Sequence, residues 1–326
     1  MGRAAVDDGA PGRRRDPMKV VIAGGSGALG QRIARDLVGR GDEVVVLSRS
    51  ATPVRWGRHV RWDGRTVGSW SAELDGAVLV NLCGELVFRR ATPAGIELLT
   101  RSRTEPTRAL AEACATLDRP LPMLVQMSTL AIYGDAGEPV LDESARPADD
   151  PPQMAGVARA WESAAAEITA ARRVILRTGI VFEPGTPAFD RLTGFVRWGL
   201  GGRMGGGRQW ISWLHIDDLC AIVRYCIDEP VMSGVVHATA PFPVRNRDLM
   251  TTLRRALHRP FGVPSPAPIV RFGSVFLRAD PMLVLTGRRC VPRRLLDAGF
   301  TFTHADLESA VTDLLDRRAT PVSAAR

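Results

Sequence analysis

Short apolar runs alternate with stretches of helical periodicity in the first half of the chain. The runs with the character of buried strands lie at 19–23, 44–47, 77–82, 121–127 and 174–176. After the first run, apolar residues recur at three- and four-residue spacing from Leu29 to Leu37, and longer helical stretches are expected at 91–115 and 152–171. Buried strands that alternate with helices are typical of a parallel sheet covered on both faces. The pattern therefore predicts an α/β fold with a Rossmann-type, doubly wound parallel sheet.

The alternation ends near residue 182, after which loops become more frequent. Glycines crowd residues 199–207, and four prolines fall between 260 and 268. Such segments are typical of a smaller lobe that covers one edge of a sheet. A last helix is expected at 304–318.

These changes define the expected domains. We predict a dinucleotide-binding domain at 18–182, with 212–238 packing back onto it, and a C-terminal substrate lobe at 183–211 and 239–318. Residues 1–17 and 319–326 are expected to form a disordered extension and a tail.

A glycine-rich loop follows the first predicted strand and opens the first predicted helix. It reads Gly24-Gly25-Ser26-Gly27-Ala28-Leu29-Gly30, the spacing of a dinucleotide-binding loop in the required context. Glycine allows a tight turn and a close approach to a diphosphate, and the helix N-terminus offers that anion N–H groups and a positive dipole end. The residues expected to contact a cofactor are Gly24, Ser26, Gly27, Ala28, Leu29 and Gly30; a tight turn without a ligand is the alternative. An ATP-type P-loop is excluded because no lysine follows the last glycine.

The end of the second predicted strand indicates which dinucleotide binds. NAD-preferring sites place Asp or Glu there, whereas this strand ends in Ser48, Arg49 and Ser50. A guanidinium and two hydroxyls suit a 2′-phosphate. These residues favour NADP(H) over NAD(H), with an ordinary surface arginine as the alternative.

Composition limits the compartment and the partners. The chain has 326 residues, is 45% hydrophobic, and holds no apolar run of the roughly 18 residues that a membrane span requires. Five cysteines without C-x-x-C spacing indicate free thiols in a reducing compartment and no zinc site. We predict a cytoplasmic protein with no metal, no membrane partner and a small-molecule substrate. The sequence leaves the identity of that substrate and the oligomeric state open.

The formal charge of +8 is concentrated toward the C-terminus. Residues 245–326 hold 14 arginines and seven acids, so this segment could attract an anion. An arginine-rich solvated surface is the other interpretation. Because the chain shows no nucleic-acid-binding motif, we expect no nucleic-acid partner.

Several motifs together resemble one family. They are the glycine loop, Trp62-Asp63, Asn81-Leu-Cys-Gly-Glu85, Ser128-Thr-Leu-Ala-Ile-Tyr-Gly134, Trp161-Glu162, Leu176-Arg-Thr-Gly-Ile-Val181, Gln209-Trp-Ile-Ser-Trp-Leu-His-Ile-Asp-Asp-Leu219 and Arg259-Pro260. From Met18 to Leu315 the chain resembles the extended short-chain dehydrogenase/reductase superfamily. Within it, the chain is similar to the atypical epimerase family protein branch, which carries a DUF1731-type C-terminal segment.

The resemblance implies roles for individual residues. Ser128 and Thr129 end the fifth strand, where members of the superfamily place a hydroxyl that hydrogen-bonds the substrate oxygen. Asp63 would lie near the adenine ring. The further residues expected to line the cofactor are Leu82, Cys83, Gly84, Ser128 and Thr178.

The superfamily's usual Tyr-x-x-x-Lys pair is missing. The one lysine, Lys19, precedes the glycine loop, and neither Tyr133 nor Tyr225 has a lysine four residues on. Counting as in sugar-nucleotide epimerases places Met154 and Ala158 in the two positions, and neither can transfer a proton.

Four residues are candidates to replace the missing acid/base. Glu85 follows the strand that lines the cofactor and could reach substrate. For Tyr133, and for His215 and Asp217, a structural role is the favoured alternative. Cys83 has no neighbouring cation in the sequence that would activate its thiol.

Two functions of different kinds follow. One is an NADP(H)-dependent, epimerase-like oxidoreductase with a non-standard acid/base, in which residues 199–207 and Trp198, Trp210 and Trp213 enclose a substrate. The other is a non-catalytic NADP(H)-binding sensor or regulatory protein, suggested by Met154 and Ala158. A scaffold that needs no cofactor is a third, weaker hypothesis.

Overall fold

The fold is known from a computed structural model that describes residues 16–276 and 280–319. Most of the predicted N-terminal extension and all but one residue of the predicted tail lie outside the described residues. Among the described helices, none combines the length and the hydropathy that are needed to cross a lipid bilayer.

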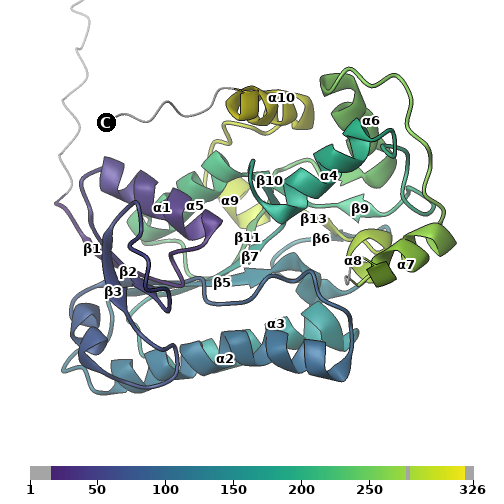
Figure 1. The fold of residues 1–326 in the computed structure, drawn as a ribbon. Helices are drawn as coiled ribbons and strands as arrows, with labels where there is room; N and C mark the ends of the chain where they lie inside the picture. Colours follow the sequence, from purple (N-terminus) through teal and green to yellow (C-terminus); the bar gives the residue numbers. More distant parts are fainter. Residues whose placement is uncertain (1–15, 277–279, 320–326) are drawn as a thin grey trace, which may run out of the picture.

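A seven-stranded parallel sheet forms the centre of the molecule, in the order β11-β7-β5-β4-β1-β2-β3 (Figure 1). Its strands, in chain order, are β1 (Lys19–Ala23), β2 (Glu43–Ser48), β3 (Arg58–Arg61), β4 (Val78–Asn81), β5 (Met123–Thr129), β7 (Arg173–Thr178) and β11 (Gly234–Ala238). The predicted fold class is therefore confirmed. The strand β3 was not predicted, because its sequence Arg-His-Val-Arg lacks an apolar run.

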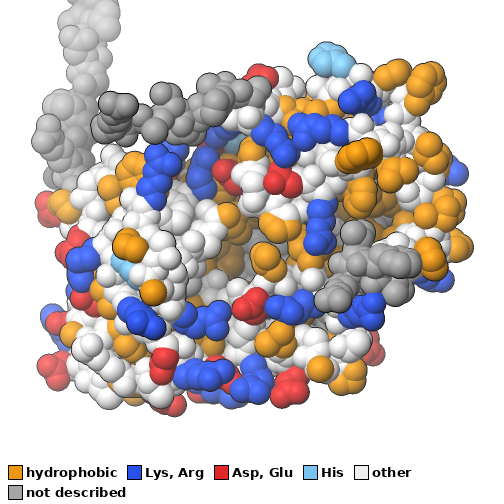
Figure 2. All heavy atoms as spheres, in the orientation of Figure 1, with side chains coloured by type: hydrophobic (Ala, Val, Ile, Leu, Met, Phe, Trp, Pro, Cys, Tyr) orange, Lys and Arg blue, Asp and Glu red, His pale blue; other side chains and the backbone are white. Residues whose placement is uncertain are grey.

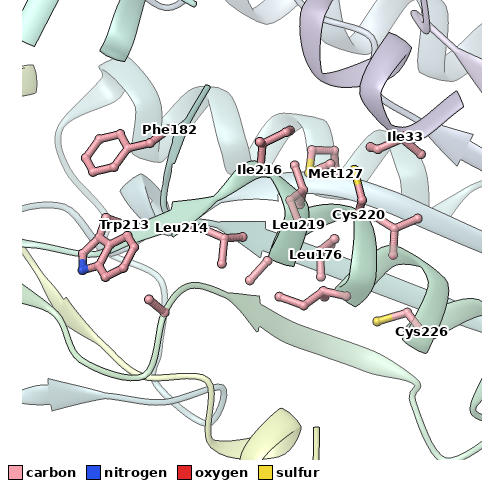
Figure 3. Packing of buried hydrophobic residues seen from close by; sticks show 14 of the residues in the cluster. Ile33, Met127, Leu176, Phe182, Trp213, Leu214, Ile216, Leu219, Cys220 and Cys226 are labelled. Carbon is pink, nitrogen blue, oxygen red and sulfur yellow. The ribbon is translucent and has the colours of Figure 1, made fainter. Parts of the chain in front are cut away.

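Helices cover both faces of the sheet. The helices α1 (Ala28–Gly39) and α5 (Ile216–Asp228) lie on one face, and α2 (Pro93–Ala115) and α3 (Val157–Ala166) lie on the other (Figure 1). Figure 3 shows how Ile33 of α1, Cys220 of α5 and Met127 of β5 meet in one buried apolar cluster. Burial of this kind stabilises a fold by about 25 cal/mol per Å² of apolar surface.

After β7 the chain leaves the central sheet and later returns to it as β11. The strands β8 (Ile180–Phe182) and β10 (Trp213–His215) pair in parallel, and α5 and β11 follow them into the core. The last of these strands, β11, pairs with β7 from Gly234↔Val174 to Ala238↔Thr178.

Most of the other elements gather beyond the carboxyl edge of the sheet (Figure 1). They are α4 (Pro187–Arg197), β9 (Trp210–Ile211), β12 (Val244–Arg245), α6 (Asn246–Ala256), α7 (Ala267–Phe276), α8 (Met282–Leu285), β13 (Arg289–Cys290) and α10 (Leu307–Ala319). The short helix α9 (Arg293–Asp297) packs beside β11, where Arg294 donates to the backbone oxygen of Val235. The strand β13 pairs with β6 (Val140–Leu141), so the C-terminal segment joins the loop that follows β5.

One predicted helix begins later than its sequence indicates. Residues 152–171 were expected to be helical, but α3 begins at Val157, after a kinked turn at Pro152–Gly156. Within the turn, Met154 has φ 65° and ψ −51°, which is left-handed backbone that cannot extend a right-handed helix.

Candidate functional site

The glycine loop approaches its neighbours too closely for a side chain at several positions, of which Gly24 and Gly30 meet backbone atoms. A Cβ on Gly24, whose φ is 75°, would lie 3.0 Å from the backbone of Cys83. A Cβ on Gly30 would lie 2.5 Å from the Cα of Gly25. Gly27 differs, because the nearest atom to its Cβ position is the carbonyl oxygen of Gly24 at 3.9 Å. The loop is thus tightly packed at Gly24 and Gly30 and open at Gly27.

That opening coincides with the N-terminus of α1. The helix begins at Ala28, its N-cap Gly27 supplies no side-chain hydrogen bond, and its first turn holds no acidic residue. The N–H groups of the first turn therefore remain for an external acceptor, and the dipole favours an anion. The backbone fits a diphosphate at this position.

The end of β2 differs in part from the prediction. The hydroxyl of Ser48 is buried; it donates to Ser26 Oγ at 2.8 Å and accepts from the Ser50 N–H at 3.1 Å. Ser48 is thus assigned to positioning the loop, in place of the predicted phosphate contact. Arg49 is 68% exposed and lies 3.5 Å from Glu85 Oε1, so its guanidinium is accessible to a ligand.

A second guanidinium lies at this edge, and the sequence pattern does not predict it. Arg61 ends β3 and pairs in register with Ser48, with its side chain exposed. Only the strand register brings it there, and β3 carries no apolar signal that would have predicted the register.

Asp63 stabilises a turn. Its Oδ1 accepts from the N–H groups of Arg65 and Thr66, and its Oδ2 accepts from the Thr66 hydroxyl at 2.6 Å. These hydrogen bonds, led by the one from the Thr66 hydroxyl, lower the pKa of Asp63 to about 2. The carboxylate is therefore held in one orientation, on an exposed turn just after β3.

The loop after β4 is held by a buried arginine. Arg103 donates to the backbone oxygen of Glu85 at 3.0 Å, and its guanidinium lies 5.2 Å from the ring centroid of Trp161. A Cβ on Gly84 would lie 2.9 Å from this guanidinium. The Glu85 carboxylate lies between Arg49 and Arg89, 3.4 Å from the latter.

Cys83 is not a nucleophile. Burial raises the pKa of its thiol to about 12, so the thiolate is not populated at neutral pH. All five cysteines are free and buried.

The two hydroxyls at the end of β5 have different surroundings. Ser128 is 2% exposed and donates to Glu162 Oε1 at 2.5 Å, so it cannot meet a substrate as predicted. Thr129 is half-buried, and its Oγ1 accepts from the Ala131 N–H at 3.1 Å. The O–H of Thr129 therefore remains available to donate to a ligand. The hydroxyl of Thr178 donates to the backbone oxygen of Ser128 at 3.0 Å.

Tyr133 belongs to a buried polar network. Its hydroxyl accepts from Arg177 Nη1 and donates to His237 Nε2, both at 2.7 Å. Arg177 also forms a two-point ion pair with Glu162, and His237 Nδ1 donates to the backbone oxygen of Val291 at 3.0 Å. We refer to Ser128, Glu162, Arg177, Tyr133 and His237 as the buried relay. Burial raises the pKa of Tyr133 to about 12, and both hydrogen bonds of its hydroxyl are made inside the protein, so the structure favours the structural role over an acid/base role.

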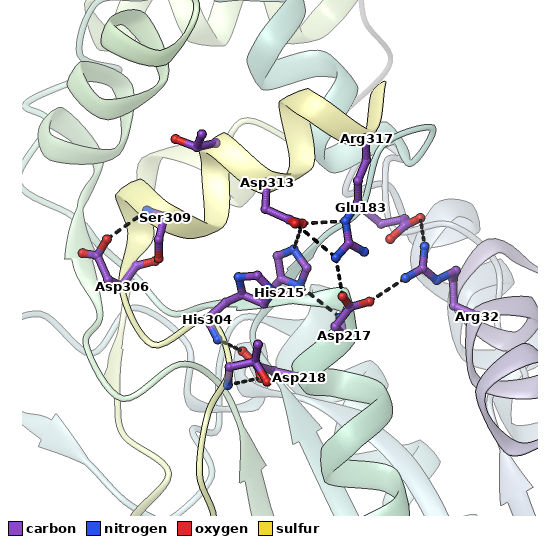
Figure 4. Close-up of polar contacts among 12 residues, drawn as sticks. Arg32, Glu183, His215, Asp217, Asp218, His304, Asp306, Ser309, Asp313 and Arg317 are labelled. Carbon is purple, nitrogen blue, oxygen red and sulfur yellow. Dashed lines mark hydrogen bonds and ion pairs between the residues drawn. The ribbon is translucent and has the colours of Figure 1, made fainter. Parts of the chain in front are cut away.

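His215 and Asp217 form a cluster of polar contacts between three helices, which we call the clasp (Figure 4). Its other members are Arg32, Asp313 and Arg317. His215 Nδ1 accepts the N–H of Asp217 at the start of α5, and its Nε2 donates to Asp313 of α10 at 3.1 Å. Arg32 of α1 and Arg317 of α10 both donate to the Asp217 carboxylate, at 2.6 and 2.5 Å. Both residues thus have structural roles.

Three residues of the clasp, together with the neighbouring His304, resemble a metal site in composition. His215, Asp217, His304 and Asp313 each offer one atom within 4.8 Å of the others. However, His215 already caps α5 through Nδ1, and arginines neutralise both carboxylates. A cation would have to displace these pairs, so the arrangement fits ionic contacts between helices.

The tryptophans do not enclose a substrate as predicted. Trp213 is fully buried and donates to the backbone oxygen of Phe242. Trp198 projects into solvent, and Trp210 packs beneath Arg245 and Arg289. The glycine-rich segment 199–207 pairs with residues 263–265 through backbone hydrogen bonds.

Sequence comparison assigns the chain to a family. The NAD dependent epimerase/dehydratase family matches residues 20–237, and a domain of unknown function, DUF1731, matches residues 265–314. The chain belongs to the NAD dependent epimerase/dehydratase family. The predicted resemblance to epimerase family proteins with a DUF1731 segment is confirmed.

Individual relatives cover nearly the whole chain. Epimerase family protein YfhF of Bacillus subtilis is 31% identical over 93% of this chain and 100% of its own length. The crystal structure of human epimerase family protein SDR39U1 with NADPH has a TM-score of 0.80 and 28% identity, covering 92% of this chain and 99% of that one. A nucleoside-diphosphate sugar epimerase from Corynebacterium glutamicum has a TM-score of 0.73 and 30% identity, covering 92% and 58%.

A methyl group on Gly30 should disturb the loop. In Gly30→Ala, the new Cβ meets the Gly25 backbone, and we expect urea denaturation to show a loss of about 1–3 kcal/mol in the free energy of unfolding. Gly39→Ala is the matched control on the same helix, because nothing lies within 4 Å of its Cβ position. Equal stability of the two variants would contradict the close approach.

Acid should destabilise the protein through His237. Burial lowers the pKa of this histidine from 6.5 to about 4. The unfolded chain therefore binds the proton first, and stability falls as the pH drops from about 6.5 toward 4, by roughly 2–3 kcal/mol. Free energies of unfolding measured from pH 7.5 to 4.5 should show a shallower slope for His237→Asn. The exposed His258, changed to Asn, should leave the slope as it is in the unmodified protein.

Proposed function

We propose that the chain binds NADP(H). The observation that carries this proposal is the open backbone at Gly27 beside the uncapped N-terminus of α1, which suits a diphosphate. The NADPH in the crystal structure of human SDR39U1 supports the same cofactor here.

The residues that would hold the cofactor lie along the carboxyl edge of the sheet. Arg49, with Arg61 as a second guanidinium, would receive the 2′-phosphate, and the turn at Asp63 would border the adenine. The remaining contacts would come from the glycine loop and the segment after β4: Gly24, Ser26, Gly27, Ala28, Leu29, Gly30, Leu82, Cys83 and Gly84. Thr178, which ends β7, would contact the cofactor from the neighbouring strand of the sheet.

We propose an oxidoreductase activity of the epimerase-like kind. When bound, the nicotinamide supplies a hydride for a carbonyl carbon or accepts one from an alcohol. For carbonyl reduction, the chain orients the substrate oxygen with the O–H of Thr129, and solvent supplies the proton that completes the alcohol.

The free thiols of the five cysteines support a cytoplasmic location.

A non-catalytic NADP(H) sensor is the second candidate. It is favoured by the absence of a titrating group at Met154 and Ala158, which are both buried, and by the sequestration of Tyr133 in the buried relay. NADPH binding measured by fluorescence, followed by NADPH turnover against a panel of carbonyl compounds, separates the two. Tight binding without turnover would support the sensor, and no binding of either dinucleotide would contradict both.

The Arg49→Ala variant tests the cofactor preference. Loss of a charge-assisted hydrogen bond should weaken NADPH binding by about 1–3 kcal/mol and leave NADH binding unchanged. Arg119→Ala, at an exposed position before β5 on the opposite edge of the sheet, is the control. Equal losses for NADPH and NADH would refute a 2′-phosphate contact.

The Thr129 hydroxyl can be tested separately from cofactor binding. We expect Thr129→Val to lower kcat by about 10²-fold, the effect of removing one donor to the substrate oxygen, while the Kd for NADPH is unchanged. Thr129→Ser keeps the hydroxyl and should retain most of the activity. A Thr129→Val enzyme with unchanged kcat would show that another group holds the oxygen.

A further inference from the structure

An apolar cluster lies beside Thr129 at the carboxyl edge of the sheet. We call it the edge cluster; it consists of buried Leu99, Met154 and Val157 and half-buried Val87, Ile96, Ala131 and Leu283. Its members come from the loop after β4, from α2, α3 and α8, and from the turns that follow β5 and precede α3.

The location of the cluster follows from its two members nearest the sheet. The N–H of Ala131 donates to Thr129 Oγ1 at 3.1 Å, so one member of the cluster lies directly beside the hydroxyl proposed to bind the substrate oxygen. Val87 follows β4, which ends at Asn81. In open parallel sheets, ligands bind outside the carboxyl ends of such strands.

Exposed apolar residues stand next to members of the edge cluster in the chain. Leu86, Leu98 and Met282 are 62%, 43% and 42% exposed, and each precedes a member of the edge cluster in the chain. Figure 2 shows this face of the molecule hollowed between the sheet edge and the lobe of α6 and α7, with hydrophobic side chains in the hollow and charged ones on its margin. Exposed apolar surface of this kind is typical of a binding site.

One buried member of the cluster, Met154, has a strained backbone conformation. Met154 has φ 65°, a conformation that costs a non-glycine residue about 1–3 kcal/mol and that is concentrated at functional sites. The conformation places a thioether side chain, which adapts to irregular apolar shapes, within the edge cluster.

Few polar atoms next to the cluster remain for a ligand. Gln153 Nε2 donates to the backbone oxygen of Arg89 at 3.1 Å. Among the described residues, Gln153 Oε1 and Arg89 Nε are buried and have no hydrogen-bond partner. Surroundings with so few polar atoms suit a ligand with a single small polar group on an apolar body.

From this arrangement we infer that the substrate is a carbonyl compound with an apolar body of several carbon atoms. A nucleoside-diphosphate sugar would bury its hydroxyls against the edge cluster without enough hydrogen-bond partners, which is unfavourable. This inference rests on the proposed function, since it assigns the substrate class of the same site.

The test is a series of methyl ketones that differ only in chain length. Isothermal titration calorimetry of the full chain saturated with NADP⁺, which cannot reduce a ketone, would give Kd values for 2-butanone, 2-hexanone, 2-octanone and UDP-glucose. We expect affinity to rise about three- to fourfold for each methylene, and UDP-glucose not to bind. A flat series, or UDP-glucose binding more tightly than 2-octanone, would overturn the inference. Absence of NADPH binding in the preceding titration would instead refute the proposed function.

Two variants connect the series to the edge cluster. Leu283→Asn places an amide within it and should weaken 2-octanone binding at least tenfold while the NADPH Kd is unchanged. Leu86→Asn should weaken 2-octanone binding severalfold, and because Leu86 is exposed this substitution should not destabilise the core. Leu296→Asn, an exposed leucine on α9, is the control and should match the unmodified protein. Unchanged 2-octanone affinity in both Leu283→Asn and Leu86→Asn would place the ketone elsewhere.

Discussion

The two-point ion pair between Glu162 and Arg177 determines what the rest of the site can do. The pair lies in the interior, where an unpaired charge would be strongly unfavourable, so each partner requires the other. It joins α3 to β7, and through Ser128 and Tyr133 it extends to β5 and to His237 on β11. The hydrogen bond from His237 to Val291 then connects the C-terminal segment to the sheet.

The same pair explains which hydroxyls remain for chemistry. Ser128 donates to Glu162, and Tyr133 lies between Arg177 and His237, so neither faces a ligand. A network whose donors and acceptors are all satisfied is rigid, and removing one member leaves another buried and unpaired. With Met154 and Ala158 in the positions of the missing pair, Thr129 is left as the hydroxyl beside the proposed substrate.

The C-terminal segment makes two kinds of contact with the rest of the protein. Through α10 it is fixed to α5 and α1 by the clasp of His215, Asp217, Arg32, Asp313 and Arg317. Through α8 it contributes Leu283 to the edge cluster. Charge therefore fixes the segment at one end, and an apolar contact with the edge cluster fixes it at the other.

Local patterns determined the features that depend on near neighbours in the chain. The glycine loop, the strands and the first helix follow from short-range sterics and from periodicity, so the fold class and the place of the glycine loop in it could be predicted. The availability of Ser48 and Ser128, the place of Arg61 and the role of Tyr133 could not. Their partners lie between 13 and 104 residues away or depend on strand register. Whether a hydroxyl is free or occupied is decided by packing between distant segments, and only the tertiary structure brings those segments together.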